Sequence, residues 1–147
     1  MKTNVHYMGF GFPVLLMNVE NVEGEDGSFY LDIPHQKLAK TLFVTVLLKQ
    51  APLTGSELKF LRKYLDLTQQ DFAKLIGAKG HSNVAGWENK ADKPTGMVEQ
   101  AEMIARIKLA VEFSGGEITM EDVYTKIIKA GLTKEISMIE LNMHDVA

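Results

Sequence analysis

The chain has 147 residues, of which 46% are hydrophobic and 24% are charged, and these proportions exclude a disordered or collagen-like chain. It contains no cysteine, which excludes disulfides, thiolate catalysis and cysteine-ligated zinc. No apolar run approaches the roughly 18 residues of a membrane-spanning helix, and the N-terminus has no secretory pattern. We therefore expect a cytoplasmic protein without membrane contact.

The net charge of −3 is unevenly distributed along the chain. Residues 1–33 and residues 94–147 each carry −4, whereas residues 34–53 carry +3 and residues 54–93 carry +2. A basic middle between acidic flanks permits nucleic-acid binding by the middle of the chain, although it does not establish it.

The first third of the chain has the pattern of a small β-sheet. Residues 14–19 and 28–33 are rich in apolar, aromatic and β-branched side chains. The acidic, glycine-containing segment 23–27 between them suits a hairpin turn. The glycine- and aromatic-rich segment 7–13 has no clear period, which leaves either an irregular first strand or an exposed aromatic loop.

From Pro34 onward, helical periodicity replaces the β pattern. Apolar side chains recur at residues 38, 42 and 46–48, which predicts an amphipathic helix that ends before Pro52. Together with the strands, this helix forms a predicted N-terminal module over residues 1–50.

A densely helical region begins at Thr54, and Thr68 followed by Asp71 has the pattern of a helix N-cap. Further helices are predicted around Val84 and Trp87, from about Thr95 to Phe113, and from Thr119 to Gly131. Residues 135–142 are ambiguous between strand and helix. We therefore expect an α+β protein that is mostly α.

Residues 56–90 carry the most specific pattern in the chain. Ala73 fits the close crossing of two short helices, and Gly77 fits the turn that follows them. The next helix is expected to bury Val84 and Trp87 and to leave its first turn free. A helical bundle that merely shares this periodicity is the alternative interpretation.

This pattern, with Leu-Thr-Gln before Ala73 and Trp-Glu-Asn at its end, resembles the helix-turn-helix of the XRE/Cro family of DNA-binding domains. The resemblance implies a lambda-repressor-like domain of five helices over residues 51–115, with a C-terminal extension over residues 116–147. Its core would be formed by Ala73, Gly77, Val84 and Trp87. The spacing from Gly77 to Trp87 is one residue longer than usual, so residues 78–81 are expected to form an enlarged turn.

A wider resemblance covers about residues 1–110. The segments Val5-His6-Tyr7 and Ile33-Pro34-His35, followed by residues 53–63, are similar to the MqsA/YgiT-type antitoxin family, which places a small zinc-binding β domain before an XRE-type helix-turn-helix. That family binds zinc through two pairs of cysteines, and this chain has none. We therefore expect no metal and no other cofactor, and a degenerate zinc-finger-like hairpin held by packing of Phe, Leu and Val side chains.

In this type of fold, one helix contacts the DNA backbone and the next enters the major groove. Burial of Val84 would turn His81, Ser82 and Gly86 toward the groove. We expect His81, Ser82 and Asn83 to contact bases, because they carry the donors and acceptors that base edges require. The expected phosphate contacts are Gln69, Lys79, Asn89, Lys90 and Lys93. Lys79 suits a base or a phosphate, and plain solubility is the alternative role of each lysine.

These expectations describe a sequence-specific transcriptional regulator that binds a palindromic operator on double-stranded DNA as a homodimer. The helix from about Thr95 to Phe113 is the expected dimer contact. The wider resemblance implies the antitoxin of a type II toxin–antitoxin operon, which represses its own promoter and binds a toxin through residues 1–50 or the C-terminal extension. The alternative is a stand-alone XRE-type regulator whose N-terminal module mediates dimerisation or ligand sensing.

Other candidate chemistry is weak. His6 and His35 could meet and bind a metal, and Glu25, Asp26 and Asp32 could form a carboxylate site, but structural or solvated roles are more common for such residues. No phosphate-binding loop, zinc-protease motif or nucleophile elbow is present, so we expect no catalytic residues and no enzyme activity.

Overall fold

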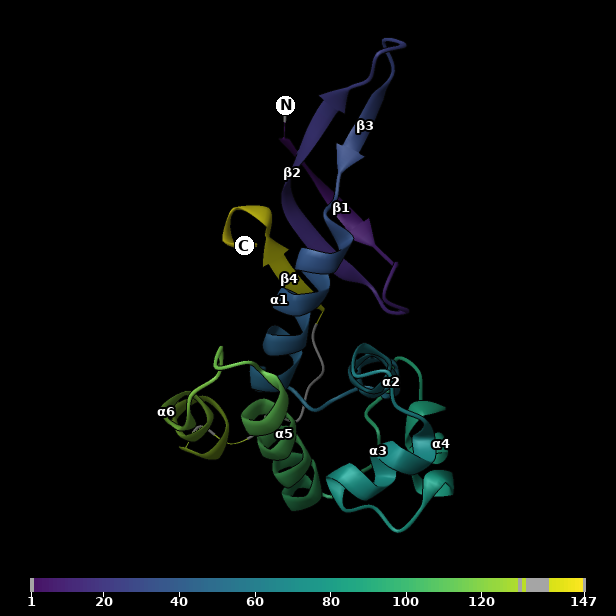
Figure 1. The fold of residues 1–147 in the computed structure, drawn as a ribbon, viewed down its shortest axis with the longest axis vertical. Helices are drawn as coiled ribbons and strands as arrows, with labels where there is room; N and C mark the ends of the chain where they lie inside the picture. Colours follow the sequence, from purple (N-terminus) through teal and green to yellow (C-terminus); the bar gives the residue numbers. More distant parts are fainter. Residues whose placement is uncertain (1, 130, 132–137, 147) are drawn as a thin grey trace. The chain divides into compact units, whose positions relative to one another are not determined.

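The computed structural model describes residues 2–129, 131 and 138–146. Within these residues it shows an α+β fold with six α-helices and a small four-stranded sheet (Figure 1). The chain divides into two compact units, the first made of Met1–Leu42 with Met138–Ala147 and the second of Phe43–Ser137. None of the described helices is long and apolar enough to cross a membrane.

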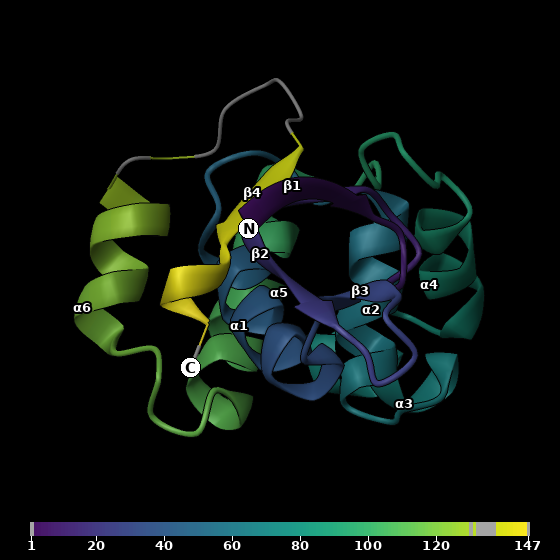
Figure 2. The ribbon, with the colours of Figure 1, turned by 90° about the horizontal axis from the view of Figure 1, so that it is seen from above.

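The sheet belongs to the first unit and has three antiparallel strands and one parallel strand, namely β1 (Lys2–Tyr7), β2 (Val14–Glu23), β3 (Phe29–Asp32) and β4 (Ile139–Asn142). β1 pairs along one edge of β2. The other edge is shared, because β4 pairs in parallel with Val14–Met17 and β3 pairs in antiparallel with Glu20–Glu23 (Figure 2). A short 3₁₀ turn, η2 (Met143–Asp145), follows β4.

A β-bulge lets β2 keep one buried face along its length. Two residues of β2, Met17 and Asn18, stand opposite a single residue of β1. Asn18 has a φ of +62°, and its side-chain amide donates to Asn142 Oδ1 over 3.1 Å. Because side chains alternate along a strand, the extra residue brings Val19 to the same buried face as Leu16.

The core of the first unit is formed by one face of the sheet and the first half of α1 (His35–Leu48). Its buried apolar side chains are Phe12, Val14, Leu16, Val19, Leu38, Leu42, Ile139 and Leu141. Phe12 corrects both interpretations of residues 7–13, because this segment is neither an irregular strand beyond Tyr7 nor an exposed loop. It is a turn that inserts one aromatic ring into the core.

The predicted hairpin is confirmed as β2 and β3 joined by a tight turn. The backbone N–H of Gly24 donates to the carbonyl of Ser28, and Gly27 has a φ of +81°, which glycine adopts without strain. The ambiguous segment 135–142 contains β4, and its residues 135–137 lie outside the described residues. Packing of the hairpin residues alone was expected to hold this module, but a fourth strand from beyond the second unit also supports it.

The second unit contains the end of α1 and a series of helices, namely α2 (Gly55–Tyr64), α3 (Gln69–Ile76), α4 (His81–Glu88), α5 (Glu99–Phe113) and α6 (Met120–Val123), which continues as the π-helical segment η1 (Tyr124–Lys129). Three threonines begin helices as predicted, because the side chains of Thr54, Thr68 and Thr119 each accept a hydrogen bond from a backbone N–H of the first turn.

Residues 51–115, all of which the structure describes, form four helices rather than the expected five. The long helix also begins at Glu99 instead of near Thr95. The reason is the segment before it, in which Pro94 forms an isolated bridge with Thr54 and the N–H of Thr95 donates to the carbonyl of Leu53. These residues are held in an extended conformation and cannot join a helix. The units also differ from the predicted domain boundaries, since the second unit extends to Ser137 and residues 138–147 belong with the N-terminal strands.

Candidate nucleic-acid interface

The pair of helices α3 and α4 is joined by a turn of four residues. Gly77 ends α3 in the left-handed conformation, with a φ of +79°, and the N–H groups of Gly77 and Ala78 both donate to the carbonyl of Ala73. Gly80 is the extended residue before α4. We expected His81 to belong to the turn, but it is the first residue of the helix. Ala73 is buried, as expected for a close helix contact.

The two faces of α4 differ in burial. Val84 is fully buried and Glu88, one turn later, is also buried. His81, Ser82, Asn83 and Gly86 are all exposed. The structure therefore brings the three predicted base-contacting side chains together on the exposed first turn of a helix whose opposite face is anchored.

Trp87 corrects one expectation about this helix. We expected Trp87 to be buried with Val84, but it is only half-buried, and Glu88 takes the inward position instead. Positions 84 and 88 are one helical turn apart and share a face, whereas position 87 lies at the border of that face. Glu88 can occupy this buried position because its carboxylate pairs with a cation.

That cation is Arg62 of α2, and its contacts connect three helices. Its Nε and Nη2 atoms donate to the two carboxylate oxygens of Glu88 over 2.7 and 3.0 Å, and Nη1 donates to the carbonyl of Leu67 over 2.9 Å. Gln69, the first residue of α3, donates from Nε2 to Glu88 Oε1 over 3.2 Å. A bidentate pair of this kind is among the stronger polar contacts in proteins. The sequence feature that indicates this pair is Glu88, a charged residue at a position where the helical period requires burial.

The residues predicted to contact phosphates differ in exposure. Gln69 is half-buried and its amide nitrogen is bonded to Glu88, so a phosphate would meet this side chain already oriented by the Arg62 pair. Exposed side chains surround the first turn and the end of α4, namely Lys79, Asn89, Lys90 and Lys93. Lys74 on α3 is also exposed and adds a positive charge that the helix-turn-helix pattern did not indicate.

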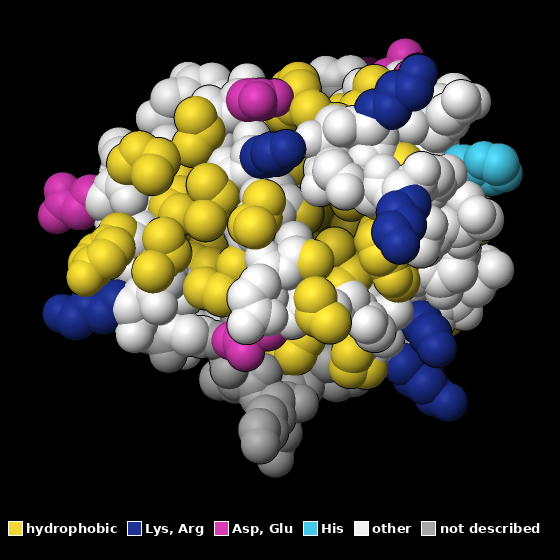
Figure 3. All heavy atoms as spheres, turned by 90° about the horizontal axis from the view of Figure 1, so that it is seen from below, with side chains coloured by type: hydrophobic (Ala, Val, Ile, Leu, Met, Phe, Trp, Pro, Cys, Tyr) yellow, Lys and Arg dark blue, Asp and Glu magenta, His cyan; other side chains and the backbone are white. Residues whose placement is uncertain are grey.

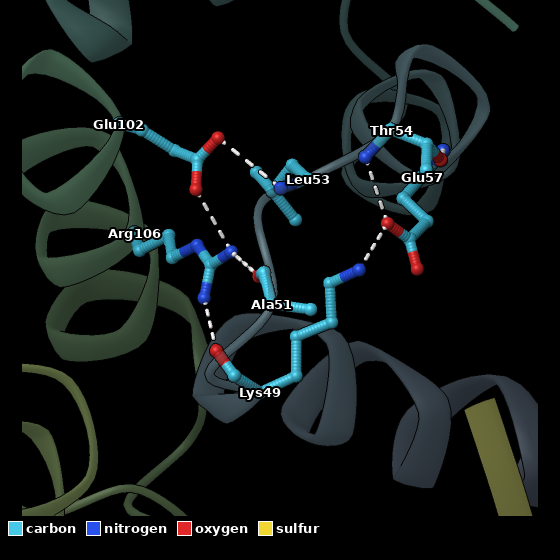
Figure 4. Close-up of polar contacts among 7 residues, drawn as sticks. All are labelled: Lys49, Ala51, Leu53, Thr54, Glu57, Glu102 and Arg106. Carbon is cyan, nitrogen blue, oxygen red and sulfur yellow. Dashed lines mark hydrogen bonds and ion pairs between the residues drawn. The ribbon is translucent and has the colours of Figure 1, made fainter. Parts of the chain in front are cut away.

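A buried polar cluster holds α2 and α5 to the segment after α1 (Figure 4). Arg106 is fully buried, and it donates to the carbonyls of Lys49 and Ala51 and to Glu102 Oε2, the last over 2.9 Å. The other oxygen of Glu102 accepts from the N–H of Leu53 over 3.1 Å. The described part of the chain offers no partner to the Nε atom of Arg106.

The second half of the cluster is the capping box of α2. Thr54 Oγ1 accepts from the N–H of Glu57, and Glu57 Oε1 accepts from the N–H of Thr54 over 2.8 Å and also pairs with Lys49. Burial lowers the pKa of Lys49 and raises the pKa of Glu102, and the neighbouring opposite charges act against both shifts. The cluster therefore fixes where α2 starts, at the expense of desolvating four charged groups.

Only part of α5, the helix expected to form the dimer contact, is exposed. One face of α5 is buried in the second unit through Ala105, Arg106 and Leu109. Exposed large hydrophobic side chains lie on its other side and on the following helical segments, namely Ile104, Val111, Phe113, Met120, Tyr124 and Ile128. Figure 3 shows hydrophobic side chains gathered on one face of the protein.

The weaker candidates do not come together as a site. Tyr7 Oη lies 2.7 Å from His35 Nδ1, and the ring of Phe10 stacks on that of His35. His6 precedes Tyr7 in β1, so its side chain points to the opposite face of the sheet. Asp26 accepts hydrogen bonds from the backbone and hydroxyl of Ser28, and these bonds lower its pKa. Among the described residues, no three His, Asp or Glu side chains are grouped so that they could hold a metal ion.

A scan of protein-family models, a search of curated proteins and a search of solved structures found no match to this chain.

Proposed function

We propose that the protein is a sequence-specific DNA-binding transcriptional regulator. The observation that carries this proposal is the exposed first turn of α4, where His81, Ser82 and Asn83 lie side by side. An α-helix fits the major groove of B-DNA, and hydroxyl, imidazole and amide groups match the donor and acceptor pattern of base edges there. The helix is short, and its buried residues, Val84 and Glu88, lie on the face opposite this turn.

The surroundings of α4 support the same function. Lys79 precedes the helix, and Lys90 and Lys93 follow it, so positive charge is available on both sides of a groove-facing helix. Phosphate contacts fix the position of a protein on DNA and base contacts supply the specificity. Gly86 offers no side chain for a base contact, which concentrates the proposed readout in the first turn.

We assign α2 to α5 to an XRE/Cro-type domain, with α3 and α4 as its helix-turn-helix. Ala73 at the helix contact, Gly77 in the left-handed conformation and buried Val84 support this assignment. The enlarged turn and the half-buried Trp87 are its departures from the family pattern.

A single α4 contacts too few base pairs for strong specificity, so we propose that a homodimer binds a palindromic operator. The exposed hydrophobic side of α5 and α6 supplies a surface for that contact. The similarity to MqsA/YgiT-type antitoxins favours the antitoxin of a type II toxin–antitoxin operon that represses its own promoter. The second candidate is a stand-alone regulator in which the first unit mediates dimerisation or ligand sensing, and the compact sheet with its own core suits that role.

The test is a binding titration of the full chain on the DNA upstream of its own gene and on random DNA, at several salt concentrations. We expect the affinity for both DNAs to fall with salt, with a log–log slope of several units, because phosphate contacts release counterions. His81→Ala and Ser82→Ala should each cost about 1–3 kcal/mol on the upstream DNA and little on random DNA.

Lys90→Ala is the matched control, since a lost phosphate contact should weaken binding to both DNAs nearly equally. If only Asn83→Ala loses affinity, the base contacts lie one residue further along α4 than proposed. A wild-type affinity that does not depend on salt, or no binding to the upstream DNA, would overturn the proposal.

A further inference from the structure

Two of the outer strands of the sheet, β1 and β3, are protected to different degrees. β1 carries Lys2 and polar side chains, and the bulge in β2 interrupts its pairing. β3 pairs with β2 in unbroken register over its four residues and contains neither lysine nor proline. Charges, prolines and bulges are the usual means of keeping another strand from pairing with an edge. β3 has only Asp32 for this purpose.

The side chains of β3 are exposed on both faces of the sheet. Phe29 is 67% exposed, Tyr30 is 55% exposed and Leu31 is 38% exposed. Among the described residues, no strand pairs with the outer edge of β3. The pairing of β1 ends where Lys2 meets Glu20, so the hairpin extends beyond β1 as a two-stranded ribbon (Figure 1). Such ribbons are only marginally stable in water unless a further strand or helix covers them.

The charge around this edge is of one sign. Residues 1–33 contain one basic residue, Lys2, which already lies 3.7 Å from Glu20. The acidic side chains of the hairpin are all exposed, namely Glu20, Glu23, Glu25, Asp26 and Asp32. Pairing of two copies through β3 would bring two acidic hairpins together, and like charges on paired strands are destabilising. A second copy is therefore a poor occupant of this edge.

We propose that β3 is the docking edge for a basic protein, which adds a strand to the sheet and covers Phe29, Tyr30 and Leu31. Main-chain hydrogen bonds along the free edge would supply affinity, while the aromatic side chains and the acidic hairpin would supply specificity. This inference rests on the antitoxin part of the proposed function, in which the basic partner is the toxin. It assigns the contact to one strand of residues 1–50.

The probe is the purified product of the reading frame next to the gene of this protein, titrated calorimetrically against the full chain. We expect a complex whose affinity falls with salt, and slower amide hydrogen exchange at residues 29–32 in the complex. Phe29→Lys combined with Leu31→Lys should weaken binding about tenfold or more, since it removes apolar contacts and adds repulsion. The corresponding double change to Glu should weaken it less, because it removes the contacts but keeps the attraction.

Met8→Lys is the matched control, because Met8 is 58% exposed in the same unit but lies in the turn between β1 and β2. It should change the affinity less than twofold, and circular dichroism should show all variants folded. The absence of a complex, equal affinities for all variants, or protection of residues other than 29–32 would overturn the inference. Operator binding measured on the same samples separates the two proposals, because the β3 variants should bind DNA as the wild type does.

Discussion

The close approach of α2 to the end of α4 can be tested at Gly55. This residue is buried at the first position of α2, and a Cβ added there would lie 2.6 Å from the carbonyl oxygens of Trp87 and Glu88 and 2.7 Å from the nitrogen of Ala91. All three are backbone atoms, so no side-chain rotation relieves the clash. Overpacking of this kind costs about 1–3 kcal/mol, and the higher helix propensity of alanine offsets at most about 1 kcal/mol.

We therefore expect Gly55→Ala to lower the free energy of unfolding by about 1–2 kcal/mol. Gly86 is the matched control, because it lies inside α4 and its added Cβ would meet nothing within 4 Å. Gly86→Ala should raise the free energy of unfolding by about 0.5–1 kcal/mol through helix propensity alone.

The assay is equilibrium unfolding in urea, followed by circular dichroism and by the fluorescence of Trp87. This residue is the only tryptophan of the chain, and it reports on the second unit. If Gly55→Ala unfolds at the same urea concentration as the wild type or at a higher one, while Gly86→Ala is stabilised, α2 and α4 do not approach each other as described.

Three further changes test other parts of the second unit by urea unfolding. Arg106→Ala leaves the carboxylate of Glu102 and two carbonyls buried without their partner, so it should cost about 3–5 kcal/mol, and a loss below about 1 kcal/mol would contradict the buried cluster. Trp87→Ala, followed by circular dichroism, should cost less than the roughly 3–5 kcal/mol of a fully buried aromatic side chain, and a full-sized loss would show that Trp87 is in the core. Hydrogen bonds from Thr119 at the start of α6 lower the pKa of Asp122 below its ordinary value of 3.8, so its contribution to stability is present above that pH and is lost as the pH falls through the folded-state pKa. Asp122→Asn should therefore make the urea midpoint less sensitive to pH below about 4, and an unchanged pH profile would refute this role.

The elements that could be predicted from the sequence are those with local signals. Thr54, Thr68 and Thr119 begin helices because each side chain accepts from a backbone N–H only three residues away. The hairpin turn is local in the same sense, since Gly24 bonds to Ser28. The phase of α4 followed from burying Val84, and it placed His81, Ser82 and Asn83 on the exposed side. Whether these three contact bases stays a prediction.

The features that could not be predicted depend on residues far apart in the chain. β4 pairs with β2 across more than a hundred residues. Its four residues alternate apolar and polar side chains, but so short a pattern gives no sign of the partner strand. The inward position of Glu88 depends on Arg62, which lies 26 residues earlier. The start of α5 at Glu99 rather than near Thr95 depends on the backbone bond between Thr95 and Leu53. In each case a tertiary contact overrode or completed the local preference.

The parallel pairing of β4 with β2 has a consequence for how the protein is made. β4 follows the whole second unit in the chain, although it completes the sheet of the first unit. A ribosome therefore finishes the second unit while the edge of β2 at Val14–Met17 is still open. The helices can fold during synthesis, but the sheet closes only after Asn142 has left the exit tunnel. Until then, β2 presents an unpaired apolar edge, and this interval is the period when a chaperone is most useful to the chain.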